Sequence, residues 1–175
     1  MKKITKGFTL IELLIVIALL GVLAVALLAA LDPLEQIKKG TDTGVRNTVS
    51  EIQAAFIRYA AVNNATLPSK GFISWGAITS GGSASDAIQL AIEAGELKAD
   101  FFSLSKGQLD KIYMIADTEK AYVCFSPSAK SFKVDANTKF VTVASPNGTA
   151  TMKEETTCKN GTVPAGGATC YWCMR

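Results

Sequence analysis

The chain has 175 residues, enough for about one domain, and 49% of them are hydrophobic. Its formal charge of +3 comes from Lys2, Lys3 and Lys6, since the remaining 15 basic residues balance 15 acidic ones, and no nucleic-acid partner is expected. The absence of histidine excludes histidine acid–base catalysis, Ser-His and Cys-His nucleophiles and most zinc sites. We therefore expect no enzymatic activity, no catalytic residue, no metal and no cofactor.

The first predicted element is a long apolar helix. Every residue from Leu13 to Leu31 is aliphatic except Gly21. These 19 residues match the roughly 20 that span a bilayer as a helix. A carboxylate, Glu12, stands directly before the run, and a charge inside a bilayer costs up to roughly 3 kcal/mol, less near the helix end. The sequence therefore needs an explanation for Glu12 as well as for the helix.

Two common interpretations explain the apolar run alone. A secretory signal peptide would fit the basic start and the small-x-small pattern at Ala24-Val25-Ala26, but its apolar region is usually only about 7–15 residues long. A simple membrane anchor would fit the lysines, which favour the cytoplasmic side. Neither interpretation gives Glu12 a role.

The sequence GFTLIELLIVIALLGVLA, which begins at Gly7, closely resembles the type III signal peptide of type IV pilins and pseudopilins, and most of all that of a bacterial major pilin. The strong resemblance covers residues 1–31, and a looser one covers the helix that follows. It implies that a prepilin peptidase cuts after Gly7, that Phe8 is then N-methylated, and that Glu12 is needed for filament assembly. It also implies a leader at residues 1–7.

The chemistry of the cut end is consistent with this resemblance. Cleavage would create a positive α-amino group on Phe8, and a charge in an apolar environment needs a partner. Phe8 and Glu12 are four residues apart, on one face of a helix. In the family the matching glutamate is thought to pair with the N-terminus of a neighbouring subunit. We therefore hypothesise that Glu12 is unfavourable in lipid but sets the register between subunits.

The N-terminal helix is expected over residues 8–64, with residues 8–31 spanning the membrane and later forming the filament core. Many type IV pilins have a proline shortly after the glycine that matches Gly21, and their helix unwinds there in the filament. This chain has no proline near Ala29 and has Pro33 instead. We expect the helix to be interrupted near Pro33 and to loosen between Gly21 and Pro33.

The second half of this helix is amphipathic. Its apolar residues recur in steps of four and three, which predicts a stripe packed on a core. The helix is expected to end near Asn63-Asn64. The residues of the stripe are Val45, Val49, Ile52, Phe56 and Tyr59.

A globular head is expected over residues 65–175. Residues 67–83 are predicted as a loop. A short helix is predicted over Ala87–Ala94, with Ser85 as its N-cap and Gly95 as its C-terminal stop. Ile112–Ala116 and Ala121–Phe125 are predicted to form a hairpin.

Two more elements are predicted after the hairpin. Residues 127–136 could form a short helix with Ser126 as cap and Pro127 at the first position, or else a strand. Thr138–Ala144 is predicted as a strand. The tail, residues 145–175, is rich in Gly, Thr, Asn and Pro, which predicts a loop with little core of its own.

The four cysteines are expected to form structural disulfides that hold this tail. An even count in an exported chain favours disulfides, with metal binding and redox chemistry of the CxxC pair as alternatives. Four cysteines allow three connectivities, and we weakly favour a bond from Cys124 to a tail cysteine. The candidates are Cys124, Cys158, Cys170 and Cys173.

The predicted fold class is α+β, a long N-terminal helix packed on a small antiparallel sheet with a disulfide-tied C-terminal loop. The resemblance implies a structural subunit that waits in the bacterial inner membrane as a single-pass protein and then enters a helical surface filament with copies of itself. It also implies a prepilin peptidase and methylase, an assembly ATPase and a membrane platform protein as partners. The alternative is a pseudopilin of a type II secretion system or of a competence pilus. A binding module released by signal peptidase is the remaining possibility.

Overall fold

The computed structural model describes residues 7–68, 71, 73–78, 82–116, 120–144, 150–160, 164 and 168–175. Most of the expected leader lies outside these residues. The chain divides into two compact units, residues 1–37 and 38–175, and each is described separately below. The second unit adds residues 38–64 to the segment predicted as the globular head, and the whole unit is called the head below.

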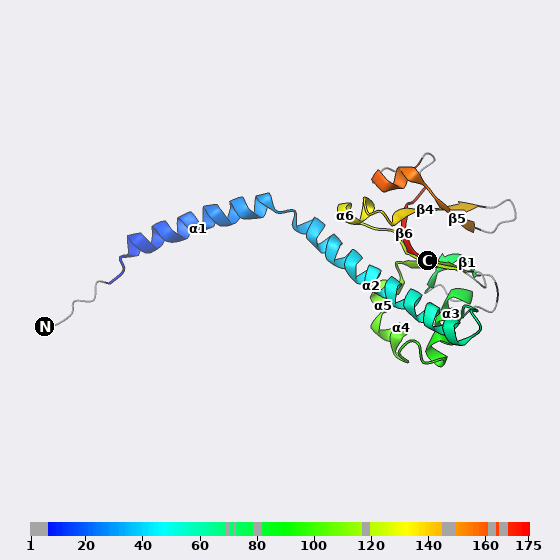
Figure 1. The fold of residues 1–175 in the computed structure, drawn as a ribbon. Helices are drawn as coiled ribbons and strands as arrows, with labels where there is room; N and C mark the ends of the chain where they lie inside the picture. Colours follow the sequence, from blue (N-terminus) through cyan, green and yellow to red (C-terminus); the bar gives the residue numbers. More distant parts are fainter. Residues whose placement is uncertain are drawn as a thin grey trace. The chain divides into compact units, whose positions relative to one another are not determined.

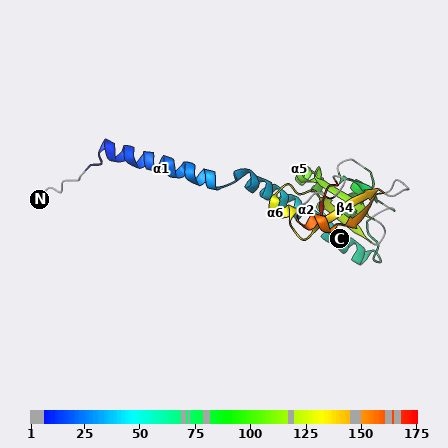
Figure 2. The same ribbon diagram turned by 90° about the horizontal axis from the view of Figure 1, so that it is seen from above.

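The apolar segment forms one helix, α1 (Leu10–Ala30), and a second helix, α2 (Pro33–Val62), follows after a break of two residues. The break is visible in both views of the ribbon (Figures 1 and 2). Leu31 is extended, with φ −101° and ψ 137°, and Asp32 accepts a hydrogen bond from the Glu35 N–H at 3.2 Å. Asp32 thus caps α2, and Pro33 occupies the first helical position, where its missing N–H has no cost.

Gly21 was a candidate for helix interruption together with Pro33, but it does not interrupt α1 in this structure, and the break lies at Leu31 and Asp32. The helix runs through it without a break. A single glycine costs a helix only about 1 kcal/mol relative to alanine, whereas a proline removes a hydrogen bond and restricts the residue before it. The helix is therefore broken only before Pro33.

α2 ends at Val62, close to the predicted Asn63-Asn64, and it carries the predicted stripe. Val45, Val49, Ile52 and Phe56 are at most 1% exposed. α2 also continues through Gly44, where an added Cβ would lie 3.3 Å from Gln108 Nε2. Glycine at this position lets the Gln108 side chain lie against the helix, where it accepts a hydrogen bond from Thr48 Oγ1.

A buried carboxylate fixes α2 to a distant segment of the head. Asp42 is 3% exposed. Its oxygens accept hydrogen bonds from the N–H and hydroxyl of Ser128, both at 2.8 Å, and from the N–H of Ala129 at 2.7 Å. This contact also explains why α6 (Lys130–Lys133) begins later than the predicted Pro127. The Ala129 backbone is extended (ψ 141°) where it meets Asp42.

Replacing Asp42 is expected to destabilise the head. Asp42→Ala leaves the N–H groups of Ser128 and Ala129 without an acceptor, and the cost is about 1–3 kcal/mol for the buried Ala129 N–H and less for the N–H of the exposed Ser128. Asp42→Asn, which keeps one acceptor oxygen, should cost less. Urea unfolding of the full chain in detergent measures the difference. The matched control is Asp100→Ala, because the exposed Asp100 side chain makes no cap hydrogen bond. Equal midpoints for Asp42→Ala and Asp100→Ala would contradict the anchoring role.

The head contains one six-stranded antiparallel sheet in the order β1-β2-β3-β6-β4-β5. The predicted hairpin is confirmed as β2 (Ile112–Ala116) and β3 (Ala121–Phe125), and the predicted third strand as β4 (Thr138–Ala144). The edge strands β1 and β5 approach each other, so the sheet is curled. The α+β fold class is thereby confirmed.

The tail is not a loop, and this prediction is wrong. It supplies β5 (Ala150–Glu154), a 3₁₀ turn (Thr156–Asn160) and β6 (Tyr171–Met174). β6 lies between β3 and β4, inside the sheet (Figure 1). Its Trp172 is 1% exposed, packs on Phe125 and donates its Nε1–H to Asp135 Oδ1 at 3.0 Å. A few apolar residues at the end of a polar segment therefore complete the core.

The loop predicted over residues 67–83 also contains a strand, β1 (Ile73–Ala77). Ile73 is buried, and the Trp75 ring stacks on Tyr113 of β2 at 5.3 Å. The sequence does not predict this strand, because Gly76 interrupts its pattern and glycine is unfavourable inside a strand. Two short helices that had not been predicted, α4 (Phe101–Leu104) and α5 (Lys106–Leu109), also belong to the head.

The predicted short helix is present as α3 (Ser83–Glu93). It begins earlier than expected, after Gly82, so Ser85 is not its N-cap. The Ser85 hydroxyl instead donates to the Ile78 carbonyl. Gly95 ends the helix with φ +79°, a conformation that glycine adopts without steric cost.

The two faces of the sheet bury different sets of residues. The face towards α2 carries the main core, which includes Ile112, Met114, Val123, Phe125 and Trp172. The other face carries a smaller cluster around the Cys124–Cys173 disulfide and Phe140, with Trp75, Tyr122, Tyr171 and Met152 packed against it.

Tyr171 of this smaller cluster has a perturbed hydroxyl group. Its burial, with a smaller contribution from Tyr113, raises the pKa of Tyr171.

Candidate functional site

The candidate site is the start of α1, where the sequence predicts cleavage and assembly. Gly7, Phe8 and Thr9 precede the helix and are not helical. The Phe8 side chain is 80% exposed. Thr9 is the N-cap, with φ −85° and ψ 150°. The peptide bond between Gly7 and Phe8 therefore lies in non-helical chain, outside the hydrogen-bonded ladder of α1.

Glu12 has a partner within its own chain, which the sequence interpretation had not identified. Its Oε2 accepts hydrogen bonds from the Thr9 N–H at 2.8 Å and from the Thr9 hydroxyl at 2.6 Å. The Glu12 N–H donates in return to Thr9 Oγ1 at 3.3 Å. This is a capping box, in which the cap and the third helical residue satisfy each other's backbone donors. The pattern Thr-x-x-Glu could have been read from the sequence.

The capping box orients the Glu12 carboxylate through only one of its two oxygens. Both hydrogen bonds that Thr9 donates go to the same oxygen, Oε2. A carboxylate has two oxygens and about four acceptor positions. Among the residues that the structure describes, Oε1 has no hydrogen-bond partner, so it could accept a second interaction, such as a hydrogen bond from the α-amino group of another chain. The hypothesis that Glu12 pairs with a neighbouring Phe8 is compatible with this geometry but is not tested by a single chain.

The surface of α1 defines what this helix needs around it. None of its side chains is buried, and its large aliphatic side chains are between 46% and 82% exposed. It is also long and apolar enough to cross a membrane. Because exposed aliphatic surface is unfavourable in water, α1 requires lipid or other apolar helices around it.

The cysteines form two disulfides, Cys124–Cys173 and Cys158–Cys170. The first joins directly opposed residues of β3 and β6, and the second closes a loop before β6. Cys170 and Cys173 are not bonded to each other, and within the described residues no cysteine is free. Redox chemistry or metal binding by the CxxC pair would need free thiols, and both of its cysteines are in disulfides with other cysteines.

One comparison with known proteins gives a match. The model of the prokaryotic N-terminal methylation motif matches residues 2–28. Comparisons with curated proteins and with solved structures find no significant match. The chain thus carries the type IV pilin and pseudopilin signal, followed by the apolar helix α1. The motif supports a type IV pilin-like or pseudopilin protein and implies processing by prepilin peptidase and assembly into filaments.

Proposed function

We propose that the chain is a structural, non-enzymatic subunit of a type IV pilus. In this proposal it is held in the bacterial inner membrane by α1, is cut after Gly7 and methylated on Phe8, and is then added to a surface filament. An assembly ATPase and a membrane platform protein would supply the work. The observation that carries the proposal is the pairing of the methylation motif with a 21-residue helix that buries no side chain in its own chain.

When a subunit leaves the bilayer, the aliphatic surface of α1 must be covered again. Copies of the same helix can cover it if each subunit uses one surface against a different surface of the next, and such contacts give an open helical filament when the rotation between subunits does not close into a ring. The head, with its own core and two disulfides, would then form the outer part of the filament.

The C-terminal region favours a pilus over a secretion pseudopilus. Major pseudopilins often carry an acidic calcium-binding loop there, but this chain has no aspartate after Asp135. Its two neighbouring glutamates are in contact with cations. Glu154 lies 2.9 Å from Lys139 and 3.7 Å from Arg175, and Glu155 lies 4.0 Å from Lys153. These carboxylates are therefore engaged in ion pairs.

Electron microscopy tests the proposal. Filaments sheared from cells that express the chain at its native level are labelled with an antibody against the head. Label along the whole filament is the expected result, and it should be lost when the prepilin peptidase gene is deleted. Label that stays with the cell envelope, with no surface filament, would favour the pseudopilin instead.

Processing depends on the small residue before the cut. Gly7→Leu is expected to leave the leader attached, because the peptidase of this family needs a small residue at this position. Immunoblots of membranes should show a chain heavier by the leader, in the amount that the parent gives as mature chain. Gly40→Leu is a matched control, since this exposed glycine lies away from the cut and an added Cβ there meets no atom within 4 Å. Normal mature chain from Gly7→Leu would contradict the assigned cleavage site.

A further inference from the structure

The head carries a basic surface at the end where α2 enters it. Lys39 and Arg46 lie on α2 seven residues apart, which is about two turns, so they share one face of the helix. Lys130 and Lys133 lie three residues apart on α6 and are also neighbours on a helix surface. All four residues are exposed. These four residues are called the basic patch.

Contacts between α2 and α6 bring the two halves of the basic patch together, and α6 lies beside α2 in both views of the ribbon (Figures 1 and 2). Asp42 accepts hydrogen bonds from the backbone directly before α6. Arg46, one turn further along α2, has its guanidinium 5.9 Å from the centre of the Phe132 ring of α6. The same guanidinium lies 5.2 Å from the centre of the Trp172 ring. Two aromatic rings therefore hold this arginine next to the helix that carries the two lysines.

The carboxylates of the same segments are used inside the chain. Asp42 is buried and bonded to the backbone before α6. Asp135, which follows α6, accepts the indole N–H of Trp172 at 3.0 Å. Lys130 has an interaction of its own, but its ammonium group has three donors. Among the residues that the structure describes, no carboxylate forms an ion pair with the other three members of the basic patch.

An exposed apolar side chain accompanies the lysines of α6. Val134 directly follows this helix and is 57% exposed. Basic residues next to aliphatic ones suit the interface of a bilayer, where the cations meet anionic headgroups and the aliphatic atoms enter the boundary with the acyl chains. The patch therefore offers both kinds of contact that an anionic lipid surface can satisfy.

The chain itself brings the basic patch close to a bilayer. α1 ends at Ala30 and α2 begins at Pro33, so Lys39 follows about 9 Å along α2 and Arg46 about 20 Å along it. The headgroup layer on one side of a bilayer is only about 5–8 Å thick. An upright α2 would hold Arg46 above this layer. A helix that tilts at the break before Pro33 would lay one face on it, and Lys39, Arg46 and α6 lie on the same side of α2.

We propose that the basic patch docks the head on the anionic surface of the membrane that holds α1. The occupant is a bilayer with acidic phospholipids, whose phosphate groups would meet the four cations while Val134 enters the interface. The proposal rests on the membrane residence of α1, which is part of the proposed function, but not on filament assembly. Because α1 tethers the head to the bilayer, the lipid surface is present at a high effective concentration. These contacts would keep the unassembled head low on the membrane, and they would break when the subunit is extracted.

The full chain in lipid nanodiscs tests the proposal by methyl NMR. Nanodiscs of phosphatidylcholine alone are compared with nanodiscs in which part of it is replaced by phosphatidylglycerol, and both contain a trace of lipid with a Gd³⁺ chelate on its headgroup. The reporter is the Val134 methyl group. The reference is Val143, which is also exposed but lies on β4.

Docking should raise the relaxation enhancement of Val134 at least about threefold in the anionic nanodiscs, because each cation near such a surface is attracted to it. The enhancement of Val143 should change much less. Sodium chloride at about 1 M should remove most of the difference, since it reduces the Debye length to about 3 Å.

Charge-matched variants separate the basic patch from the overall charge of the head. Lys130→Gln/Lys133→Gln should lower the enhancement of Val134 in anionic nanodiscs to its value in neutral ones, and Lys130→Arg/Lys133→Arg should retain it. The matched control is Lys98→Gln/Lys120→Gln, which removes the same charge elsewhere and should have little effect.

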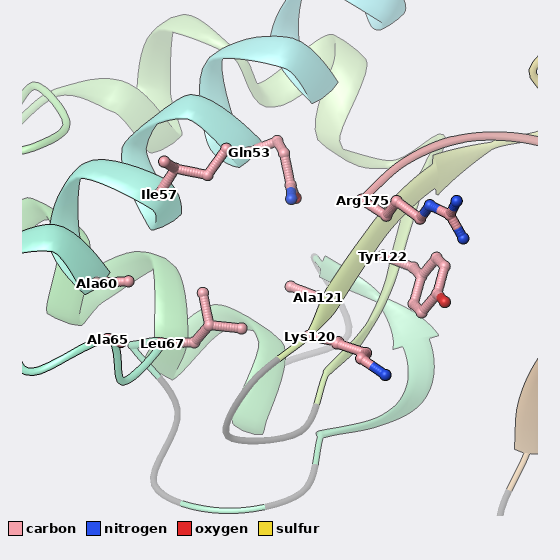
Figure 3. A pocket seen from close by; sticks show the side chains of 9 residues that line it. All are labelled: Gln53, Ile57, Ala60, Ala65, Leu67, Lys120, Ala121, Tyr122 and Arg175. Atoms are coloured by element: carbon pink, nitrogen blue, oxygen red, sulfur yellow. The ribbon is translucent and has the colours of Figure 1, made fainter.

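The two control lysines lie away from the basic patch. Lys98 is exposed and follows Glu96, which pairs with Arg58 in the C-terminal half of α2. Lys120 lines a pocket near the end of α2 together with Ala60 (Figure 3), about 30 Å along the helix from Lys39. Since all four replaced lysines are exposed, each double variant should keep the melting temperature of the parent.

Equal enhancement of Val134 in neutral and anionic nanodiscs would overturn the proposal, and this is the result expected if the basic patch serves the head of another subunit instead. Equal losses in the two glutamine double variants would also overturn it, because they would show that only the net charge matters. A chain that does not enter nanodiscs at all would overturn the membrane residence of α1 as well. A chain that enters them without a lipid-dependent enhancement would overturn the docking alone.

Discussion

Surface filaments are expected to disappear when Glu12 is replaced by valine, although the subunit stays in the membrane and is still cut. If Glu12 pairs with the Phe8 amine of a neighbour, Glu12→Val leaves that amine buried and unpaired. Losing one partner of a buried ion pair costs about 3–5 kcal/mol, and here the loss repeats at every subunit. The measurement is the yield of sheared filaments relative to the amount of cleaved, membrane-resident chain.

The capping box provides the control for this experiment. Glu12→Val also removes the hydrogen bonds to Thr9, so its effect alone does not isolate the charge. Glu12→Gln keeps a residue that can complete a capping box but carries no charge, and it should also lose most filaments. Thr9→Val removes the hydroxyl but keeps the carboxylate, and it should lose far fewer. Normal filaments from Glu12→Gln would show that Glu12 serves the cap and not a pairing between subunits.

The second large effect is expected from the disulfide that holds β6. Replacing Cys124 and Cys173 together by alanine should lower the free energy of unfolding by about 4 kcal/mol in the chain-entropy model, since the two residues are 49 apart. The same change at Cys158 and Cys170, which are 12 apart, should cost about 3 kcal/mol. The loss of Cys124–Cys173 also removes the covalent bond between β3 and β6, the strand that carries Trp172.

Urea unfolding of the full chain in detergent, with and without reductant, measures both disulfides. The parent should show no alkylatable thiol when it is denatured without reductant. The Cys124→Ala/Cys173→Ala chain should have the lower midpoint of the two double variants. A lower midpoint for the Cys158→Ala/Cys170→Ala chain would contradict the assignment of the larger role to the bond in the sheet.

The parts of the fold that could be predicted from the sequence are those set by local pattern. The stripe from Val45 to Phe56 has the helical period, and the β2–β3 hairpin has two short apolar strands joined by four residues. β6 could not be predicted, because Tyr171–Met174 is short and follows a polar segment. Its place between β3 and β4 depends on strands far away in the sequence. The same holds for β1, whose burial depends on β2 and α3.

The functional residues divide in the same way, into those predicted by a local sequence motif and those placed only by the tertiary fold. The signal around Gly7, Phe8 and Glu12 is a contiguous motif, so the sequence alone predicts it, and the Thr9–Glu12 capping box is readable from its spacing. Asp42 and Arg46 gave no such signal. Each is a polar residue on an amphipathic helix, and only the tertiary fold shows that one binds Ser128 and Ala129 while the other lies next to the lysines of α6.

The most direct test of the central claim is mass spectrometry of the N-terminal peptide of the chain from purified surface filaments. We predict that this peptide begins at Phe8 and carries one methyl group on its α-amine, and that the chain is a structural component of the filament itself. A mature chain that begins at Leu27 or Leu31 and is found free in the medium, outside any filament, would contradict it and indicate a secreted module.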